Sequence, residues 1–205
     1  MHNLELIAQR IQGSLDEKDE VREIAIKSSR ALIRMSSSVV HGMHKGQDGE
    51  AMLMEAIDES HKLKSVLSEH VDIWHSGIVQ DALQEVAEAA ILTAIVKGHE
   101  LPTPDQLGMP GTAYLMGMAD TIGELRRFSL EALRRGDTAT AERHLDTMEE
   151  MFLVIMRFDY PDAIISIRRK QDIARSVLEK TRGDVAVAVS GERLSARMSE
   201  LEKKL

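Results

Sequence analysis

The sequence contains no cysteine. Without thiols the chain can form neither a disulfide framework nor a zinc site with thiolate ligands. Aromatic residues make up only 3% of the chain, whereas methionine occurs 12 times. A core of Leu, Ile, Val, Ala and Met suits packed helices better than paired strands, which favour aromatic and β-branched residues. The composition therefore predicts an all-α fold and is compatible with a reducing compartment.

Long hydrophobic runs and excess positive charge are absent as well. No stretch approaches the roughly 20 apolar residues needed to span a bilayer, and the opening MHNLELIAQRIQ lacks the apolar run of a signal peptide. We therefore expect a cytoplasmic protein without a membrane partner. The net charge of −8 argues against a general duplex binder, whose affinity depends on excess Lys and Arg. It still allows basic stripes on one surface.

Proline and glycine positions divide the chain into helical segments. Only four prolines occur, and three of them fall within residues 98–111, which we predict to be a loop. A chain of this length is most simply one domain, here residues 1–205. We expect helices at about 3–45, 50–97 with a break near 69–72, 112–135, 138–158, 161–182 and 191–204.

The first segment with unusual chemistry is LQEVAEA, residues 83–89. On a helix, the hydrophobic residues around it form one face, made of Val79, Leu83, Val86 and Ala90. Asp81, Glu85 and Glu88 fall on the opposite face, where the two glutamates are three residues apart and therefore neighbours.

The second segment is YLMGMADTIGELRR, residues 114–127, in which Asp120 and Glu124 lie one helical turn apart. Gly117 and Gly123 remove side-chain bulk, so that another helix or a ligand can approach closely. Arg126 and Arg127 follow directly and add positive charge beside these acids, as a nucleic-acid ligand would require.

If the two carboxylate faces met, four acids would converge and would need protons or a cation to offset their repulsion. Oxygen ligands select Mg²⁺ or Mn²⁺, which could activate water for phosphodiester cleavage. The alternative is that both faces are ordinary solvated helix surfaces. A ferritin-like di-iron site is excluded, because the position three residues after Glu88 is Ile91 and the one after Glu124 is Arg127.

Basic and histidine residues elsewhere are candidates for binding nucleic acid. Lys27, Arg30 and Arg34 recur along one side of the first helix, where they either follow a phosphate backbone or form a solvated face. His70 and His75 flank the single tryptophan and are candidates for RNA contact or surface exposure. A further basic run, residues 168–170, is more typical of a solvated face.

The two acidic segments also carry a resemblance. AYLMGMADTIGELRRFSLEALRRGD, residues 113–137, and LQEVAEA, residues 83–89, resemble paired motifs of the translin and Trax family. Residues 16–46 resemble the first helix of that family and residues 151–184 its closing helices. The resemblance implies a bundle of seven helices that assembles into a hollow octamer and binds single-stranded RNA or DNA inside.

In Trax-type subunits the corresponding acids form a Mg²⁺-dependent endoribonuclease site, which translin subunits lack. The resemblance therefore implies that Glu85, Glu88 and Asp120 hold the metal, Mg²⁺ or alternatively Mn²⁺, with Glu124 assisting catalysis. Departures from the family occur around Trp74, where the chain has histidines and Asp72 but no arginine.

Three hypotheses follow from the sequence. The first is a homo-oligomeric, Mg²⁺-dependent endoribonuclease acting on single-stranded RNA, with an octamer favoured. The second is a non-catalytic single-strand binder of the same fold, and the third is a scaffold for protein assembly. The expected subunit contacts are MFLVIM at 151–156 and AII at 163–165, which contain more apolar residues than one core-facing stripe needs.

Overall fold

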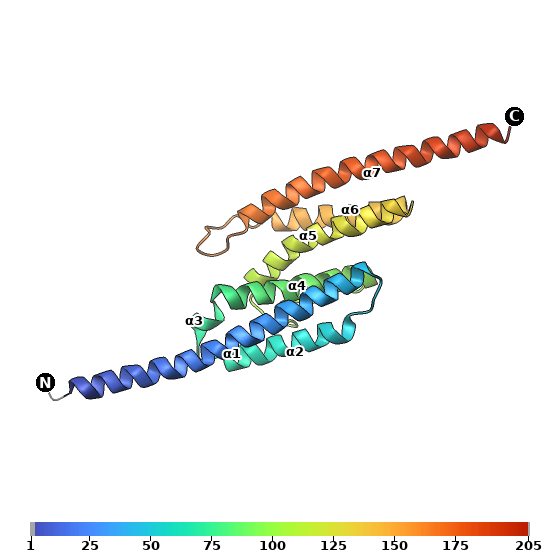
Figure 1. The fold of residues 1–205 in the computed structure, drawn as a ribbon. Helices are drawn as coiled ribbons and strands as arrows, with labels where there is room; N and C mark the ends of the chain where they lie inside the picture. The colour runs from blue at the N-terminus through green and yellow to red at the C-terminus, as the bar shows by residue number, and fades with distance from the viewer. Residues whose placement is uncertain (1–2, 205) are drawn as a thin grey trace. The chain divides into compact units, whose positions relative to one another are not determined.

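The computed structural model describes residues 3–204, which form seven helices and no strand. Figure 1 shows their arrangement. The helices are α1 (Leu4–His44), α2 (Glu50–Val66), α3 (Val71–Trp74), α4 (Gly77–Lys97), α5 (Gly111–Arg134), α6 (Thr138–Ile155) and α7 (Arg168–Glu202). The predicted all-α fold of about seven helices is confirmed, and no described helix is long and apolar enough to cross a membrane.

Two compact units make up the chain, unit 1 (Met1–Gly117) and unit 2 (Met118–Leu205). The boundary falls within α5, whose first turns belong to unit 1 and whose remainder belongs to unit 2. The candidate acids are therefore divided, since Glu85 and Glu88 lie in unit 1 whereas Asp120 and Glu124 lie in unit 2.

Helix α4 forms the centre of unit 1, where it is packed by α1, α2 and α3. Its predicted apolar face is buried, including Val79, Leu83 and Val86. Burial extends well beyond that face, because Ala82, Ala87, Ala89 and the run 91–94 are buried too. A helix that is apolar nearly all round belongs in a core, which explains why α4 lies between its neighbours.

The buried stripe of α1 differs from the one that helical spacing in the sequence predicts, which consists of Val21, Ile24, Ser28, Leu32, Met35 and Val39. Val21, Ser28 and Met35 are only half buried and Ile24 is exposed, whereas Leu32 and Val39 are buried as expected. The positions that face the core are Ala25, Ser29, Leu32, Ser36, Val39 and Gly42. Small side chains at four of these positions allow the neighbouring backbones to approach closely. A prediction from hydrophobicity alone misses such positions, because serine and glycine are not counted as apolar.

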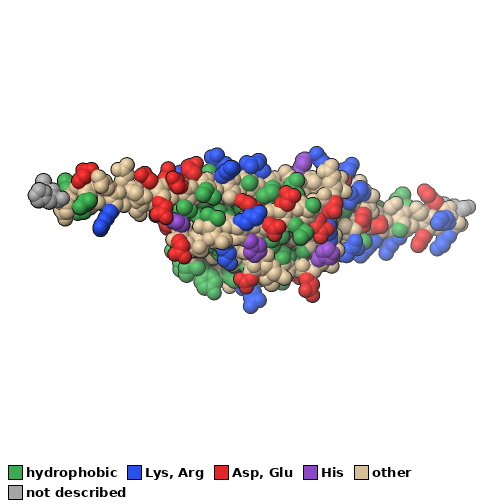
Figure 2. Space-filling model, turned by 90° about the horizontal axis from the view of Figure 1, so that it is seen from below, with side chains coloured by type: hydrophobic (Ala, Val, Ile, Leu, Met, Phe, Trp, Pro, Cys, Tyr) green, Lys and Arg blue, Asp and Glu red, His purple; other side chains and the backbone are tan. Residues whose placement is uncertain are grey.

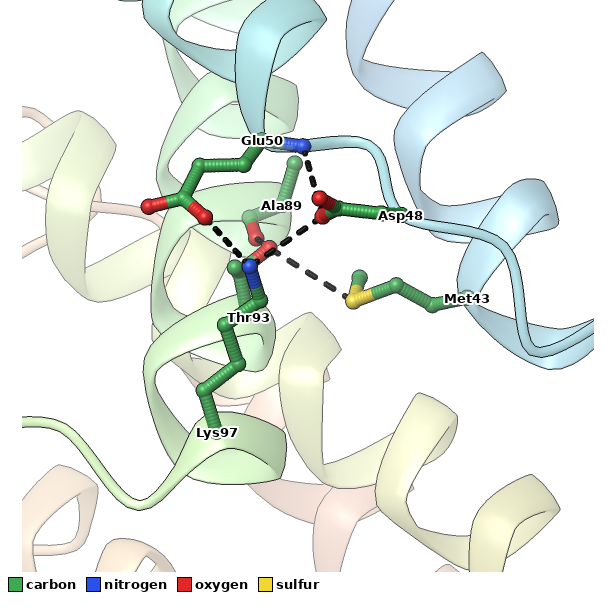
Figure 3. A network of polar contacts seen from close by, with 6 residues as sticks. All are labelled: Met43, Asp48, Glu50, Ala89, Thr93 and Lys97. Atoms are coloured by element: carbon green, nitrogen blue, oxygen red, sulfur yellow. Dashed lines mark hydrogen bonds and ion pairs between the residues drawn. The ribbon is translucent and has the colours of Figure 1, made fainter.

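The turn between α1 and α2 is attached to the end of α4 (Figure 3). Lys97 Nζ donates to Asp48 Oδ1 at 3.1 Å and to Glu50 Oε2 at 2.5 Å. These bonds raise the pKa of Lys97 above its ordinary value, and the bond from Lys97 lowers the pKa of Asp48. One turn earlier, Thr93 Oγ1 lies 2.7 Å from the carbonyl oxygen of Ala89. The predicted turn at residues 45–49 is thereby confirmed and anchored.

In unit 2, α6 packs against α7, with a small core cluster of Ala132, Ala141 and Val185. The sequence offers Asp137 or Thr138 as the cap of this helix, and Asp137 is the one that caps α6, because its side chain accepts a hydrogen bond from the Thr140 backbone N–H at 3.0 Å. The predicted break between 182 and 191 is wrong, since α7 continues through both Gly183 and Gly191. Burial of Val185 against α5 and α6 offsets the roughly 1 kcal/mol by which each glycine disfavours a helix.

The segment between α6 and α7 is a loop rather than the predicted start of a helix at Pro161. Helix α6 ends at Ile155, and α7 begins only at Arg168. Gln171 determines this geometry, because its buried side-chain Nε2 donates to the carbonyl oxygens of Ile155 (2.8 Å) and Phe158 (3.0 Å). A side chain of the next helix thus donates to carbonyl oxygens that would accept backbone N–H bonds if α6 continued.

Candidate nucleic-acid site

Glu85 and Glu88 lie on α4 and are half buried. The residues beside them, Val86 and Ala87, are fully buried. Asp81, which the sequence placed on the same face, is exposed. The two glutamates are therefore less accessible to water than Asp81.

Gly117 accounts for the close packing around these glutamates within unit 1. A Cβ atom at this position would lie 2.5 Å from the Gln84 carbonyl oxygen and 2.9 Å from the Glu88 backbone nitrogen. Only glycine permits this approach of α5 to α4, as the sequence predicted. At Gly123 a Cβ atom would meet nothing within 4 Å, so that glycine borders open space instead.

Asp120, on the unit 2 part of α5, forms an ion pair with Lys170 of α7. The Lys170 Nζ atom lies 2.5 Å and 2.6 Å from the two carboxylate oxygens. Only 20% of the Lys170 side chain and 29% of the Asp120 side chain is exposed. The carboxylate is thus partly withdrawn from water and held against a cation.

The arginines that follow Asp120 contact acids of unit 2. Arg127 donates to both oxygens of Glu124 at 3.1 Å, one turn apart on the same helix. Arg126 bonds the Thr181 hydroxyl at 3.0 Å and pairs with Asp184 at 2.9 Å. Glu124 itself is largely buried, with 17% of its side chain exposed.

Carboxylate oxygens are the ligands that Mg²⁺ prefers, so the chemistry of the four acids fits such an ion. The contacts that these acids make in the structure differ from those of an assembled metal site. Among residues 3–204, no group of three or more His, Asp or Glu side chains is arranged to hold a metal ion. Asp120 already contacts the ammonium group of Lys170. A metal ion on this carboxylate would have to share it with that ammonium group or displace the group.

Lys27, Arg30 and Arg34 are all exposed on α1, as a phosphate-binding stripe requires. Lys27 also lines a groove of about 640 Å³ between α1 and α2, together with acids that include Glu55 and Asp58. Acidic and basic side chains are interspersed over the face shown in Figure 2. The charge around Lys27 is therefore mixed.

The region around Trp74 has one exposed and one half-buried histidine. His75 is exposed, and His70 is half buried at the start of α3. Asp72 forms an ion pair with Lys18 of α1. This contact lowers the pKa of the Asp72 carboxyl, chiefly through the hydrogen bond from Lys18.

Lys170 is the residue of this region that the sequence did not single out. It lies 50 positions from Asp120, within a basic run that resembles a solvated face. No local motif connects the two positions, because only the packing of α7 beside α5 brings them together.

Comparison with known proteins supports the resemblance of the acidic motifs. The Translin family profile matches residues 18–183. The chain belongs to the Translin family. It is 33% identical over 189 residues to the uncharacterized protein MJ0175 of Methanocaldococcus jannaschii, covering 92% of this chain and 85% of that protein.

Solved structures of the same fold are also similar. AfC3PO in complex with duplex RNA is 30% identical, with a TM-score of 0.83 over 90% of this chain and 97% of the other. Apo-NeC3PO is 20% identical, with a TM-score of 0.77 over 88% and 96% of the two chains. The second likeness concerns the fold alone.

Proposed function

We propose that this Translin family member binds RNA and cleaves it as a metal-dependent endoribonuclease. The observation that carries the proposal is the burial of the four candidate acids. Glu85, Glu88, Asp120 and Glu124 are all half buried, whereas acids on a solvated helix face would be exposed, as Asp81 is. Withdrawing carboxylates from water is costly unless they meet partners, and a bound cation is one such partner.

The cation in this proposal is Mg²⁺, or alternatively Mn²⁺, with Glu85, Glu88 and Asp120 as the proposed ligands and Glu124 as the proposed assisting acid. When bound, such an ion polarises a phosphate and lowers the pKa of a bound water. The residues of the chain contribute position and charge. Gly117 keeps the start of α5 against α4 next to Glu88, and Lys170 and Arg127 place positive charge at Asp120 and Glu124.

RNA is the proposed ligand. The similar structure of AfC3PO contains duplex RNA, and the acidic motifs resemble those of single-strand nucleases. We propose that the protein cleaves single-stranded RNA and also binds single-stranded DNA. Duplex RNA is the second substrate against which cleavage of the single strand is to be compared. Exposed Lys27, Arg30 and Arg34 would contribute contacts to the phosphate backbone.

A second candidate function is RNA binding without cleavage. The observation that favours it is the ion pair between Lys170 and Asp120, which already supplies a cation to the carboxylate. In that case the half-buried acids would be structural, and the protein would hold RNA through its basic residues alone.

One assay separates these functions. The full-length protein is incubated with a labelled single-stranded RNA and with the matching duplex, in Mg²⁺ and in EDTA, and both cleavage and retention of the RNA are measured. Cleavage that EDTA abolishes supports the nuclease. Retention of the RNA without cleavage under every condition supports the binder. If the protein neither cleaves nor retains RNA in any condition, both proposals are overturned.

We further propose that the protein acts as a homo-oligomer, most simply an octamer. Of the expected contact segments, Ile155 and Ile165 are buried within unit 2, but Leu153 and Ile164 remain exposed. Replacing the exposed Leu153 by Asp should reduce the mass measured by light scattering, whereas Ile155→Asp would disrupt the core of unit 2 instead. A wild-type protein that behaves in solution as a monomer of 22.9 kDa would contradict the assembly.

A further inference from the structure

A groove within unit 2 lies directly beside Asp120, between α5 and α7. Its volume is about 350 Å³, and its lining includes Asp120, Gly123, Arg169, Lys170 and Ile173. Small-molecule sites in proteins begin at about 300 Å³, so this space suits a ligand of the size of one nucleotide. We refer to it as the α5–α7 groove.

Positive charge is fixed at one side of this groove. The Lys170 ammonium is held by both oxygens of Asp120, and the neighbouring Arg169 is exposed. Partly buried ion pairs contribute little net stability, because desolvation offsets the attraction between the charges. The clearer consequence of the pair is geometric, since it keeps a flexible lysine at one place in the lining.

The remaining wall of the groove is apolar. Ile173 is 53% exposed although it is a large hydrophobic residue, and Val177 lies one turn further along α7. Opposite them, Gly123 contributes no side chain, and a Cβ atom there would meet nothing within 4 Å. One held ammonium group and one exposed guanidinium group beside an open apolar wall match a nucleotide, which combines a phosphate with a sugar and a flat base.

We propose that the α5–α7 groove binds one nucleotide of an RNA strand, with Lys170 and Arg169 on its phosphate and Ile173 and Val177 against its sugar or base. An ammonium group has three N–H donors, so Lys170 can contact a phosphate oxygen while it still contacts Asp120. The inference rests on the proposed function and deepens it, because it assigns the position of the RNA strand next to an acid of the site.

The first test measures binding of a short labelled single-stranded RNA in EDTA, by fluorescence anisotropy with the full-length protein. Lys170→Met should weaken binding roughly tenfold, as expected for one lost bond to a charged group, and should lower the slope of log affinity against log salt by about 0.7. Lys180→Met, an exposed lysine of the same helix, is the matched control and should change neither quantity.

A double substitution distinguishes phosphate binding from neutralisation of Asp120. If Lys170 only cancels the charge of Asp120, Lys170→Met combined with Asp120→Asn should bind RNA like the wild type. If Lys170 contacts the phosphate, the double variant should recover only part of the affinity, because Asp120 no longer repels the phosphate but the bond from Lys170 is still missing. Wild-type affinity in the double variant would overturn the proposal.

A second substitution tests the groove itself without removing charge. Gly123→Leu places a side chain in the open space, and leucine favours a helix more than glycine does, so folding should be preserved. RNA binding should fall, whereas Gly183→Leu on α7, also in open space, should leave it unchanged. Unchanged binding by Gly123→Leu, with the fold verified by circular dichroism, would contradict an occupied groove.

The outcomes also separate this proposal from the function on which it rests. If the wild type binds no RNA in any condition, the proposed function fails and the groove with it. If the wild type binds RNA and all the groove variants bind equally well, only the groove proposal fails. A nucleoside monophosphate that binds as tightly as the oligonucleotide would likewise overturn it, because the groove would then be a site for free nucleotides.

Discussion

The two carboxylate pairs occupy contrasting environments. In unit 1, Glu85 and Glu88 lie on α4, which carries a single basic residue, Lys97, at its far end. In unit 2, Asp120 and Glu124 lie among cations, with Lys170 on one and Arg127 on the other. Both acids of unit 2 thus meet positive charge from their own unit, whereas the acids of unit 1 lie beside fully buried apolar residues of α4.

The largest expected effect comes from neutralising one acid of each pair. Glu88→Gln and Asp120→Asn should each reduce RNA cleavage by roughly 100-fold or more, because even groups that only orient a metal ligand contribute 10- to 100-fold. Cleavage rates in Mg²⁺ are measured alongside thermal unfolding, with the exposed Asp81→Asn as the control. Full activity in Glu88→Gln would restrict the chemistry to unit 2.

The next effect concerns the two glycines of α5. Gly117→Ala should destabilise the protein by about 1–3 kcal/mol, because its Cβ would meet the Gln84 carbonyl oxygen at 2.5 Å. Gly123→Ala on the same helix should instead stabilise it by roughly 0.5–1 kcal/mol. Urea denaturation of the two variants measures the difference, and equal midpoints would contradict the close packing of α5 on α4.

A smaller effect is expected for the basic stripe of unit 1. Replacing Lys27, Arg30 and Arg34 together by Gln should weaken RNA binding for every sequence alike and reduce the salt dependence by about 0.7 units of log–log slope for each lost contact. Because these three residues are exposed whereas only 20% of the Lys170 side chain is, screening by water and salt should make the loss per residue smaller than for Lys170. Affinity that is unchanged across a salt titration would assign the stripe to ordinary surface.

The smallest effect is a pH dependence of unit 1. The bond from Lys97 lowers the pKa of Asp48 below its ordinary value of 3.8 in the folded state. The ion pair therefore stabilises the fold at pH values above the ordinary pKa of Asp48. This stabilisation is lost as the pH falls from that ordinary pKa to the lowered pKa of the folded state. Asp48→Asn should therefore flatten the acid limb of a melting-temperature profile between about pH 5 and pH 2. An unchanged profile would show that the pair does not stabilise the fold.

The sequence predicted more of the fold than of the site. Hydrophobic periodicity, the cluster of prolines and Gly136 placed α1, α5 and α6 within a few residues, and Asp137 caps α6 as expected. The end of α7 was mispredicted because Gly183 and Gly191 disfavour a helix locally, whereas burial of Val185 favours it through contacts distant in the sequence.

By itself, the sequence determined the helical class and the family, and it proposed the four candidate acids, because helical spacing and short motifs are local properties of the chain. Only the tertiary structure decided which acids are withdrawn from water and which cation each one meets. Asp81 and Glu85 look alike in the sequence, yet the first is exposed and the second half buried. Lys170 reaches Asp120 across 50 residues because α5 and α7 pack side by side, and burial and pairing of this kind depend on contacts between segments that no local pattern records.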